Sequence, residues 1–211
     1  ELEAKLEQAR SGEARILLGT QMLAKGHDFP GVTLSVVINA DSGLFSADFR
    51  GPERLIQLIT QVAGRAGRAE RPGEVIIQTY NPEHHLFTAL LKGGFDACAD
   101  ALLKEREMAA LPPFRHFALL RSEARDRQQN EAILARCSAE IAGGADGLSA
   151  MGPVPAPLER RANKFRHQLL LSAARRDILH EALHRLPSLL RSLPDAKGVS
   201  WSLDIDPMSL S

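Results

Sequence analysis

The sequence predicts an α/β region followed by an α+β domain, and three observations support this fold class. Short apolar runs surround one amphipathic helical segment over residues 1–82. The pattern is then helical until Pro112 and Pro113 break it. Beyond the break the order of elements becomes strand, helix, strand, strand, helix, strand. We therefore expect a first region at 1–82, a helical linker at 83–112 and a second domain at 113–211.

The first region begins with a helix and continues with strands. Leu2, Leu6 and Ala9 are spaced as on one helical face, and the loop signal Ser11-Gly12 follows them. Three later segments are short and apolar enough to be buried strands. They are ARILLGT (14–20), VTLSVVINAD (32–41) and GEVIIQTYN (73–81).

A helix is expected between the second and third strands, in GPERLIQLITQVAG (51–64). Pro52 suits a first helical position, and an apolar stripe follows it, formed by Leu55, Leu58, Ile59 and Val62. Apolar strands joined by crossovers pair in parallel, which predicts part of a parallel sheet. Ligands of such sheets bind beyond the carboxyl ends of the strands, where Thr20 and Asp41 fall.

The second domain shows a clean βαββαβ pattern. Such a pattern predicts the ferredoxin-like arrangement, an antiparallel sheet with two helices on one face. The expected strands are 115–124, 148–161, 164–174 and 199–207, and the expected helices are 127–143 and 176–193.

Composition excludes several classes of protein. The 211 residues carry 26 basic and 26 acidic side chains, so the chain is no polycation, although a local basic stripe could still bind nucleic acid. Cys98 and Cys137 lack the spacing of a zinc site or a disulfide framework, which indicates a reducing cytoplasm. No apolar run is long enough to span a bilayer, so we expect no membrane association.

The segment QVAGRAGR (61–68) could hold a polyphosphate. The helix should end near Gly64, which leaves Arg65 and Arg68 on the turn beyond it. Two guanidinium groups can stabilise charge on a transferring phosphoryl group, and Gln61 could orient the attacking water. A helix end whose arginines merely cap backbone carbonyls is the alternative.

The loop GTQMLAKGHDFPG (19–31) follows a predicted strand, where nucleotides commonly bind. It offers polar groups at Thr20 and Gln21, a cation at Lys25 and a carboxylate at Asp28. The alternative is an ordinary surface loop.

The segment ERRANKFRHQ (159–168) concentrates cations around one aromatic ring, Phe165. Alternation along a strand puts Lys164, Arg166 and Gln168 on one face, opposite Phe165 and His167. With Arg160 and Arg161 nearby, this face suits phosphates or an acidic peptide. A solvated strand face is the alternative.

The two motifs and the second domain together resemble a known family. The segments GTQMLAKGHDFPGVTL and INADSGLFSADFRGPERLIQLITQVAGRAGR are similar to motifs V and VI of superfamily 2 DNA helicases. With LPPF, MGPVPAPLERRANKFRHQLLL and WSLDIDP they resemble the PriA family of primosomal replication-restart helicases over nearly the whole chain.

The resemblance implies a 3′ to 5′ DNA helicase that recognises stalled replication forks and starts primosome assembly. It implies a partial second RecA-like lobe, in which Gln61, Arg65 and Arg68 face the ATP phosphates near Gly26 and Asp28. The DNA-contacting residues it implies are Thr20, Gln21, Lys25, Arg160, Arg161 and Arg166. It also suggests the acidic tail of the single-stranded-DNA-binding protein and other primosome proteins as partners, and we hypothesise that Lys164 and Gln168 contact that tail.

Several family features are missing from this sequence. It has no GxxxxGK[ST] phosphate loop, no acidic magnesium motif and no cysteine-rich zinc segment. We therefore expect a C-terminal fragment that needs the parent's remaining parts to use ATP and Mg²⁺, has no ATPase activity alone, and holds neither cofactor nor metal. The alternatives are a nucleic-acid- or protein-binding module without catalytic role, and an unrelated RNA helicase, which would not explain the βαββαβ domain.

Overall fold

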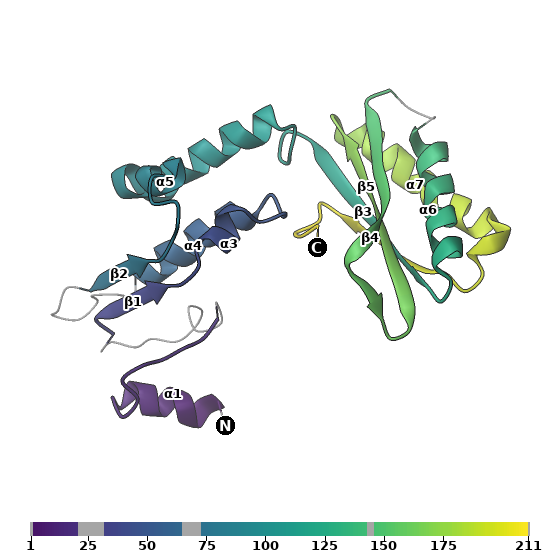
Figure 1. The fold of residues 1–211 in the computed structure, drawn as a ribbon. Coiled ribbons are helices and arrows are strands. Elements are labelled where there is room, and N and C mark those ends of the chain that lie inside the picture. The colour runs from purple at the N-terminus through teal and green to yellow at the C-terminus, as the bar shows by residue number, and fades with distance from the viewer. Residues whose placement is uncertain (1, 21–31, 65–72, 143–145, 211) are drawn as a thin grey trace. The chain divides into compact units, whose positions relative to one another are not determined.

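The structure is a computed structural model that describes residues 2–20, 32–64, 73–142 and 146–210 (Figure 1). The chain divides into two compact units, Glu1–Lys104 and Glu105–Ser211. Each unit has a hydrophobic core of its own.

The first unit contains a short parallel sheet and several helices. Strands β1 (Leu34–Val37) and β2 (Glu74–Ile77) pair in parallel, which confirms the predicted pairing. The helices are α1 (Leu2–Arg10), α3 (Asp41–Leu44), α4 (Gly51–Ala63) and most of α5 (His85–Met108).

Helix α4 forms where the sequence predicts it and ends at Ala63, with Gly64 as its C-cap. Of the predicted apolar stripe, Leu55 and Ile59 are buried, and Leu58 packs at the margin of the core. Ile56 is more deeply buried than any of these. These side chains share a core with residues of β1, α3 and α5, among them Val37, Leu44, Leu86, Phe87, Cys98 and Leu102.

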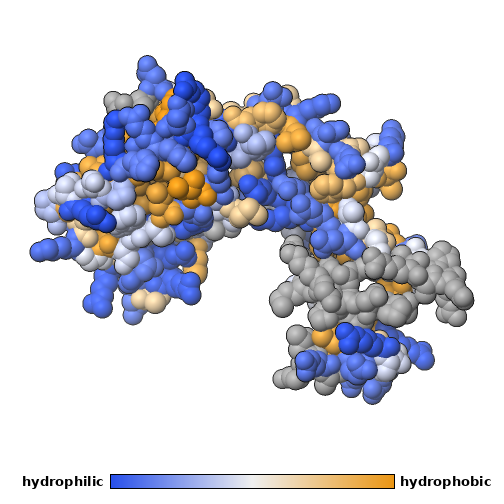
Figure 2. Space-filling model, turned by 180° about the vertical axis from the view of Figure 1, so that it is seen from behind, coloured by the Kyte–Doolittle hydropathy of each residue, from blue (hydrophilic) through white to orange (hydrophobic). Residues whose placement is uncertain are grey.

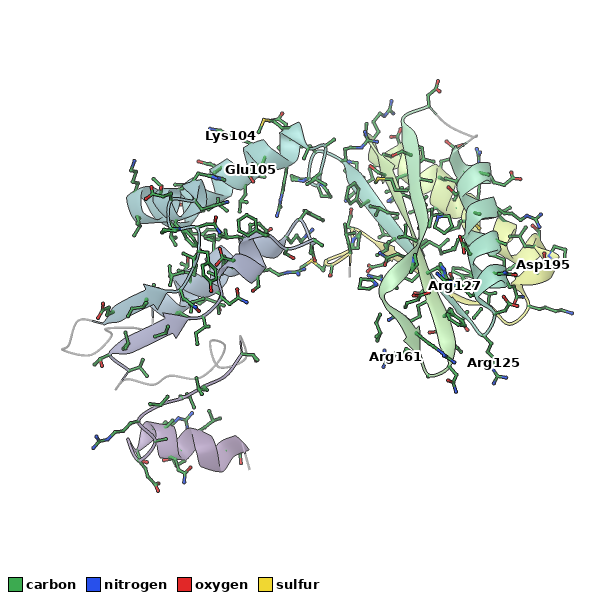
Figure 3. All side chains as sticks on the ribbon, in the orientation of Figure 1. Lys104, Glu105, Arg125, Arg127, Arg161 and Asp195 are labelled. Atoms are coloured by element: carbon green, nitrogen blue, oxygen red, sulfur yellow. The ribbon has the colours of Figure 1, made fainter. Side chains whose placement is uncertain are left out.

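Helix α5 consists of two helical stretches joined at Gly94. The backbone there has φ 67° and ψ −155°, a conformation that glycine adopts without a steric penalty. The predicted helical character of this region is therefore confirmed, with a break at Gly94. The division between the units falls within the second stretch, between Lys104 and Glu105, both labelled in Figure 3.

The predicted buried strand at 14–20 is wrong. These residues form no strand, and the side chains of Ile16 and Leu18 are 81% and 83% exposed. Strand β1 is also less buried than predicted, since Leu34 and Val36 are each half exposed. The physical reason is that a short apolar strand needs neighbours to cover it, and this sheet has only two strands among the described residues.

The second unit follows the predicted order of elements. Its four strands form an antiparallel sheet in the order β4-β5-β3-β6. Two helices and a 3₁₀ turn complete it. In chain order the elements are β3 (His116–Ala124), α6 (Arg127–Ala142), β4 (Leu148–Arg161), β5 (Lys164–Ala173), α7 (Arg176–Ser192), η1 (Pro194–Ala196) and β6 (Ser200–Ile205).

The two faces of this sheet differ in chemistry. Helices α6 and α7 lie on the same side of the sheet (Figure 1), where alternate strand residues such as Leu120, Leu169 and Leu171 are fully buried against them. The side chains between these point to the other side, which we call the open face. Its charged and amide side chains include Arg121, Glu123, Lys164, Arg166, Gln168 and Asp204.

The surface mixes hydrophilic and hydrophobic areas on both units (Figure 2). Exposed apolar side chains include Leu91 and Met108 of α5 and Met151 and Leu158 of β4. Among the described residues, no helix is both long and apolar enough to cross a membrane.

Candidate functional site

The predicted nucleotide edge is only partly within the described residues. Gln61 lies in the last turn of α4 and is exposed, and Thr20 is exposed with no regular secondary structure. The other residues predicted for this edge lie outside the described residues, and their roles stay predictions. They are Gln21, Lys25, Gly26, Asp28, Arg65 and Arg68.

Asp41 ties together the carboxyl ends of the two parallel strands. Its carboxylate accepts hydrogen bonds from the Asn81 amide at 2.6 Å, the Tyr80 backbone N–H at 2.9 Å and the Thr79 hydroxyl at 3.0 Å. These donors, led by Asn81, hold the pKa of Asp41 below its ordinary value. The sequence predicted Asp41 at this edge of the sheet. In the structure its carboxylate oxygens accept hydrogen bonds from residues that follow β2 in the same unit.

A tight hairpin between β4 and β5 carries the predicted basic segment. Arg161 pairs with Lys164 across a two-residue turn, Ala162-Asn163. Both turn residues have positive φ, 49° and 59°, the combination that matches the twist of a β-hairpin. The turn therefore brings the cations on either side of it to one end of the sheet.

Four arginines lie at this end of the sheet, and we call them the basic end: Arg125, Arg127, Arg160 and Arg161 (Figure 3 labels all but Arg160). The strand register joins them, because Ala124 and Arg160 both pair with Phe165. The Arg160 guanidinium carbon lies 5.4 Å from the centre of the Phe165 ring, and Arg127 forms a 3.2 Å ion pair with Glu159.

Sequence reasoning predicted Arg160 and Arg161 but missed Arg125 and Arg127. The signal for them was the triplet Arg125-Asp126-Arg127, which joins the end of β3 to the start of α6. The pairing of β3 with β5 brings this triplet beside the hairpin. Exposed guanidinium groups gathered in this way can bind successive phosphates.

Lys164, Arg166 and Gln168 share the open face, as the alternation predicted. His167, between them, points to the other side and is 1% exposed. The Lys164 ammonium donates to Glu123 at 2.7 Å, and the Arg166 guanidinium donates to the Leu158 carbonyl at 3.4 Å. The Lys164 hydrogen bond is the largest cause that lowers the pKa of Glu123.

Arg121 is an open-face residue that sequence reasoning missed. It lies directly opposite Gln168 in the β3–β5 register and forms a 2.9 Å ion pair with Asp204 on β6. Its other terminal nitrogen donates to the Ser209 carbonyl at 3.1 Å. Asp204 is thus engaged in an ion pair, as is Asp206, which pairs with Arg176 at 3.1 Å.

Two pairs of histidines have a spacing that could be imagined for metal ligands, His84 with His85 and His180 with His184. His84 and His85 stack with their ring centres 4.5 Å apart, and His180 and His184 are exposed on α7. Over the described part of the chain, no group of three or more His, Cys, Asp or Glu side chains could hold a metal ion.

Comparison with known proteins agrees with this division of the chain. Residues 1–70 match the family model for the helicase conserved C-terminal domain, and residues 107–208 match that for the primosomal protein N C-terminal domain. The chain is also 45% identical, over its full length, to replication restart protein PriA of Haemophilus influenzae. The chain belongs to the PriA family.

Other PriA relatives align almost as completely. Replication restart protein PriA of Synechocystis is 37% identical over 98% of this chain, and that of Bacillus subtilis is 35% identical over 97%. The chain spans only 29%, 24% and 26% of the length of the Haemophilus, Synechocystis and Bacillus proteins, respectively. The identity of these relatives over nearly the whole chain confirms the resemblance to the PriA family that the sequence motifs indicated.

Proposed function

We propose that this chain supplies the C-terminal portion of an ATP-dependent 3′ to 5′ DNA helicase that recognises and remodels stalled replication forks and initiates primosome assembly. The observation that supports this most is the match of the whole chain to proteins named replication restart protein PriA. The match of residues 1–70 to a helicase C-terminal domain supports the helicase part.

The first unit contributes part of the nucleotide edge in this proposal. Gln61, Arg65 and Arg68 face the ATP phosphates, near Gly26 and Asp28, and Thr20, Gln21 and Lys25 couple that edge to DNA. The proposal for these residues stands on the sequence motifs. ATP and Mg²⁺ binding need the phosphate loop and acidic motif that this sequence lacks.

This arrangement predicts that the chain alone hydrolyses no ATP. The assay is phosphate release by the purified chain with Mg²⁺ and forked DNA. Hydrolysis that persists through purification and is lost in Arg65→Ala would overturn this part of the proposal.

The second unit contributes DNA binding through its basic end. Arg160 and Arg161 end β4 just before the hairpin turn, and Arg166 lies on β5 just after it. We also take the strand order β4-β5-β3-β6, with both helices on one side, as the ferredoxin-like arrangement that the sequence predicts. In that arrangement neither α6 nor α7 covers the open face.

The same unit binds an acidic peptide, the tail of the single-stranded-DNA-binding protein, through Lys164 and Gln168. Both side chains lie on the open face, and both offer N–H donors that suit carboxylates and carbonyls. Other primosome proteins are the further partners in this proposal.

The test is anisotropy of a labelled fork and of an equal-length duplex, titrated with the full chain at several salt concentrations. Replacing both Arg160 and Arg161 by Ala should weaken fork binding about tenfold and reduce the salt slope by about two, since each phosphate contact contributes roughly one. The matched control replaces Arg185 and Arg191 on α7, which are equal in charge but away from the hairpin.

Two outcomes would contradict the proposal. If the control substitutions weaken fork binding equally, the loss of affinity comes from the change in net charge and not from the hairpin. Equal binding of fork and duplex would remove fork recognition from this part of the protein.

A further inference from the structure

The donors of the open face are already occupied by acceptors of the same chain. Arg121 binds Asp204 and the Ser209 carbonyl, Lys164 binds Glu123, and Gln168 donates to the Leu210 carbonyl at 3.2 Å. Two of these acceptors are consecutive backbone carbonyls. Side-chain donors that contact backbone carbonyls bind a peptide through groups that every residue carries.

Residues 207–210 reach this position because the chain turns sharply at Asp206. The Asp206 backbone has φ 52°, in the left-handed region, and therefore leaves the direction of β6. Two contacts hold the turn: the Asp206 N–H donates to the Phe117 carbonyl at 3.0 Å, and its carboxylate pairs with Arg176 at 3.1 Å. The segment beyond is thereby directed onto the open face, where Pro207 is buried.

Arg121 is suited to hold a second main chain in the same place. Its 2.9 Å ion pair with Asp204 fixes one side of the guanidinium, and this leaves the other nitrogen to donate to a carbonyl. Gln168, directly opposite Arg121 across the β3–β5 pair, provides the next donor. The two side chains thus form one site that takes an acidic or extended peptide through its backbone carbonyls and carboxylates.

We propose that residues 207–210 cover this peptide site in cis, and that a partner's acidic peptide binds by displacing them from Arg121 and Gln168. The proposal rests on the proposed peptide binding by Lys164 and Gln168 and adds Arg121 as a binding residue and 207–210 as its competitor. A covering segment lowers the apparent affinity for the partner in proportion to the fraction of molecules in which the site is open.

The experiment compares the chain with a variant that lacks residues 208–211. A fluorescent acidic peptide is titrated by anisotropy, and the side-chain amide resonances of Gln168 are followed by NMR. Deletion should tighten peptide binding about tenfold, as expected if the site is covered in roughly nine molecules of ten, and should shift the Gln168 resonances. Replacing Arg121 and Gln168 together by Met should abolish the effect of the deletion.

Gln129→Met is the matched control for these substitutions. Gln129 also donates to two backbone carbonyls, those of Asp195 and Lys197, but it does so from α6. This variant should keep the full response to the deletion. Thermal unfolding of every variant shows whether the second unit still folds.

The outcomes separate the two proposals. Peptide affinity that is unchanged or weaker after the deletion overturns the competition. If the peptide binds neither form, the proposed peptide binding is refuted. In that case the NMR result still tests the position of residues 207–210, because Gln168 resonances that do not shift on deletion show that these residues do not contact Gln168.

Discussion

The ammonium group of Lys164 lies 2.7 Å from a carboxylate oxygen of Glu123 on the neighbouring strand. Both side chains are more than one third exposed, so the pair contributes little to stability. The ion pair affects ligand binding instead, because Glu123 neutralises the Lys164 charge that would otherwise attract a phosphate or a peptide carboxylate. Lys164, Arg166 and Arg161 all help to lower the pKa of Glu123, which keeps it ionised at neutral pH.

Glu123→Gln should strengthen the binding of forked DNA and of the acidic peptide about two- to fivefold at low salt, with less effect at high salt. Anisotropy titrations at two salt concentrations measure this. Glu131→Gln on the exposed side of α6 is the control with equal charge change. Weaker binding by Glu123→Gln than by the control would show that Glu123 positions Lys164 rather than competing for it.

Asn130 should stabilise the second unit from within its core. Its fully buried amide donates to the Phe165 carbonyl at 2.9 Å and to His167 Nδ1 at 3.1 Å. Asn130→Ala removes both hydrogen bonds from the core and should cost about 1–3 kcal/mol of unfolding free energy.

Urea unfolding followed by the fluorescence of Trp201, the single tryptophan, measures this cost. Gln128→Ala, two residues away on the exposed side of α6, should change stability by less than about 0.5 kcal/mol. Equal stability of Asn130→Ala and the unchanged chain would mean that water replaces the amide.

The fold of the second unit could be predicted from sequence because its strands pair with one another and its helices pack on the same sheet. Periodicity of two along β5 predicted which side Lys164 and Gln168 share, and the buried His167 confirms it. The first unit was less predictable. An apolar run such as residues 14–20 satisfies every local criterion for a strand, yet pairing depends on neighbours that local sequence does not specify.

The site shows the same limit at the level of single side chains. Arg121 follows the apolar run Phe117–Leu120 of β3 and is itself followed by Ser122 and Glu123, a pattern that does not single Arg121 out as a binding residue. Its importance comes from the register that places it opposite Gln168 and beside Asp204. Register between strands distant in sequence is a tertiary property, so neither this pairing nor the contact of Gln168 with Leu210 could be predicted from the motifs.

The two cysteines should be inert in the native protein. Both thiols are buried, and burial raises the pKa of Cys98 and raises that of Cys137 to about 11. A thiol reagent near neutral pH should therefore label them at least roughly a hundredfold more slowly in buffer than in urea. Mass spectrometry of the labelled peptides assigns each rate to its unit. Fast labelling of Cys137 while Trp201 fluorescence stays native would contradict the buried position.

Asp41 should make the first unit's stability depend on pH at the acid end. The folded protein holds the pKa of Asp41 below the ordinary 3.8, because Asn81 and Tyr80 donate to the ionised carboxylate. A carboxylate with a depressed pKa stabilises the fold above its unfolded pKa and loses that contribution as the pH falls through the folded pKa. Asp41→Ala should therefore lower the urea midpoint of the first unit at neutral pH, and the difference from the unchanged chain should shrink below about pH 4.

Far-UV circular dichroism follows this transition, and Trp201 fluorescence identifies the separate unfolding of the second unit. Asp100→Ala, an exposed position on α5, removes the same charge from the same unit and serves as the control. If the two variants behave alike at every pH, the Asp41 hydrogen bonds do not stabilise the strand ends. If the Asp41→Ala deficit persists unchanged at acid pH, its cause is packing rather than the ionised carboxylate.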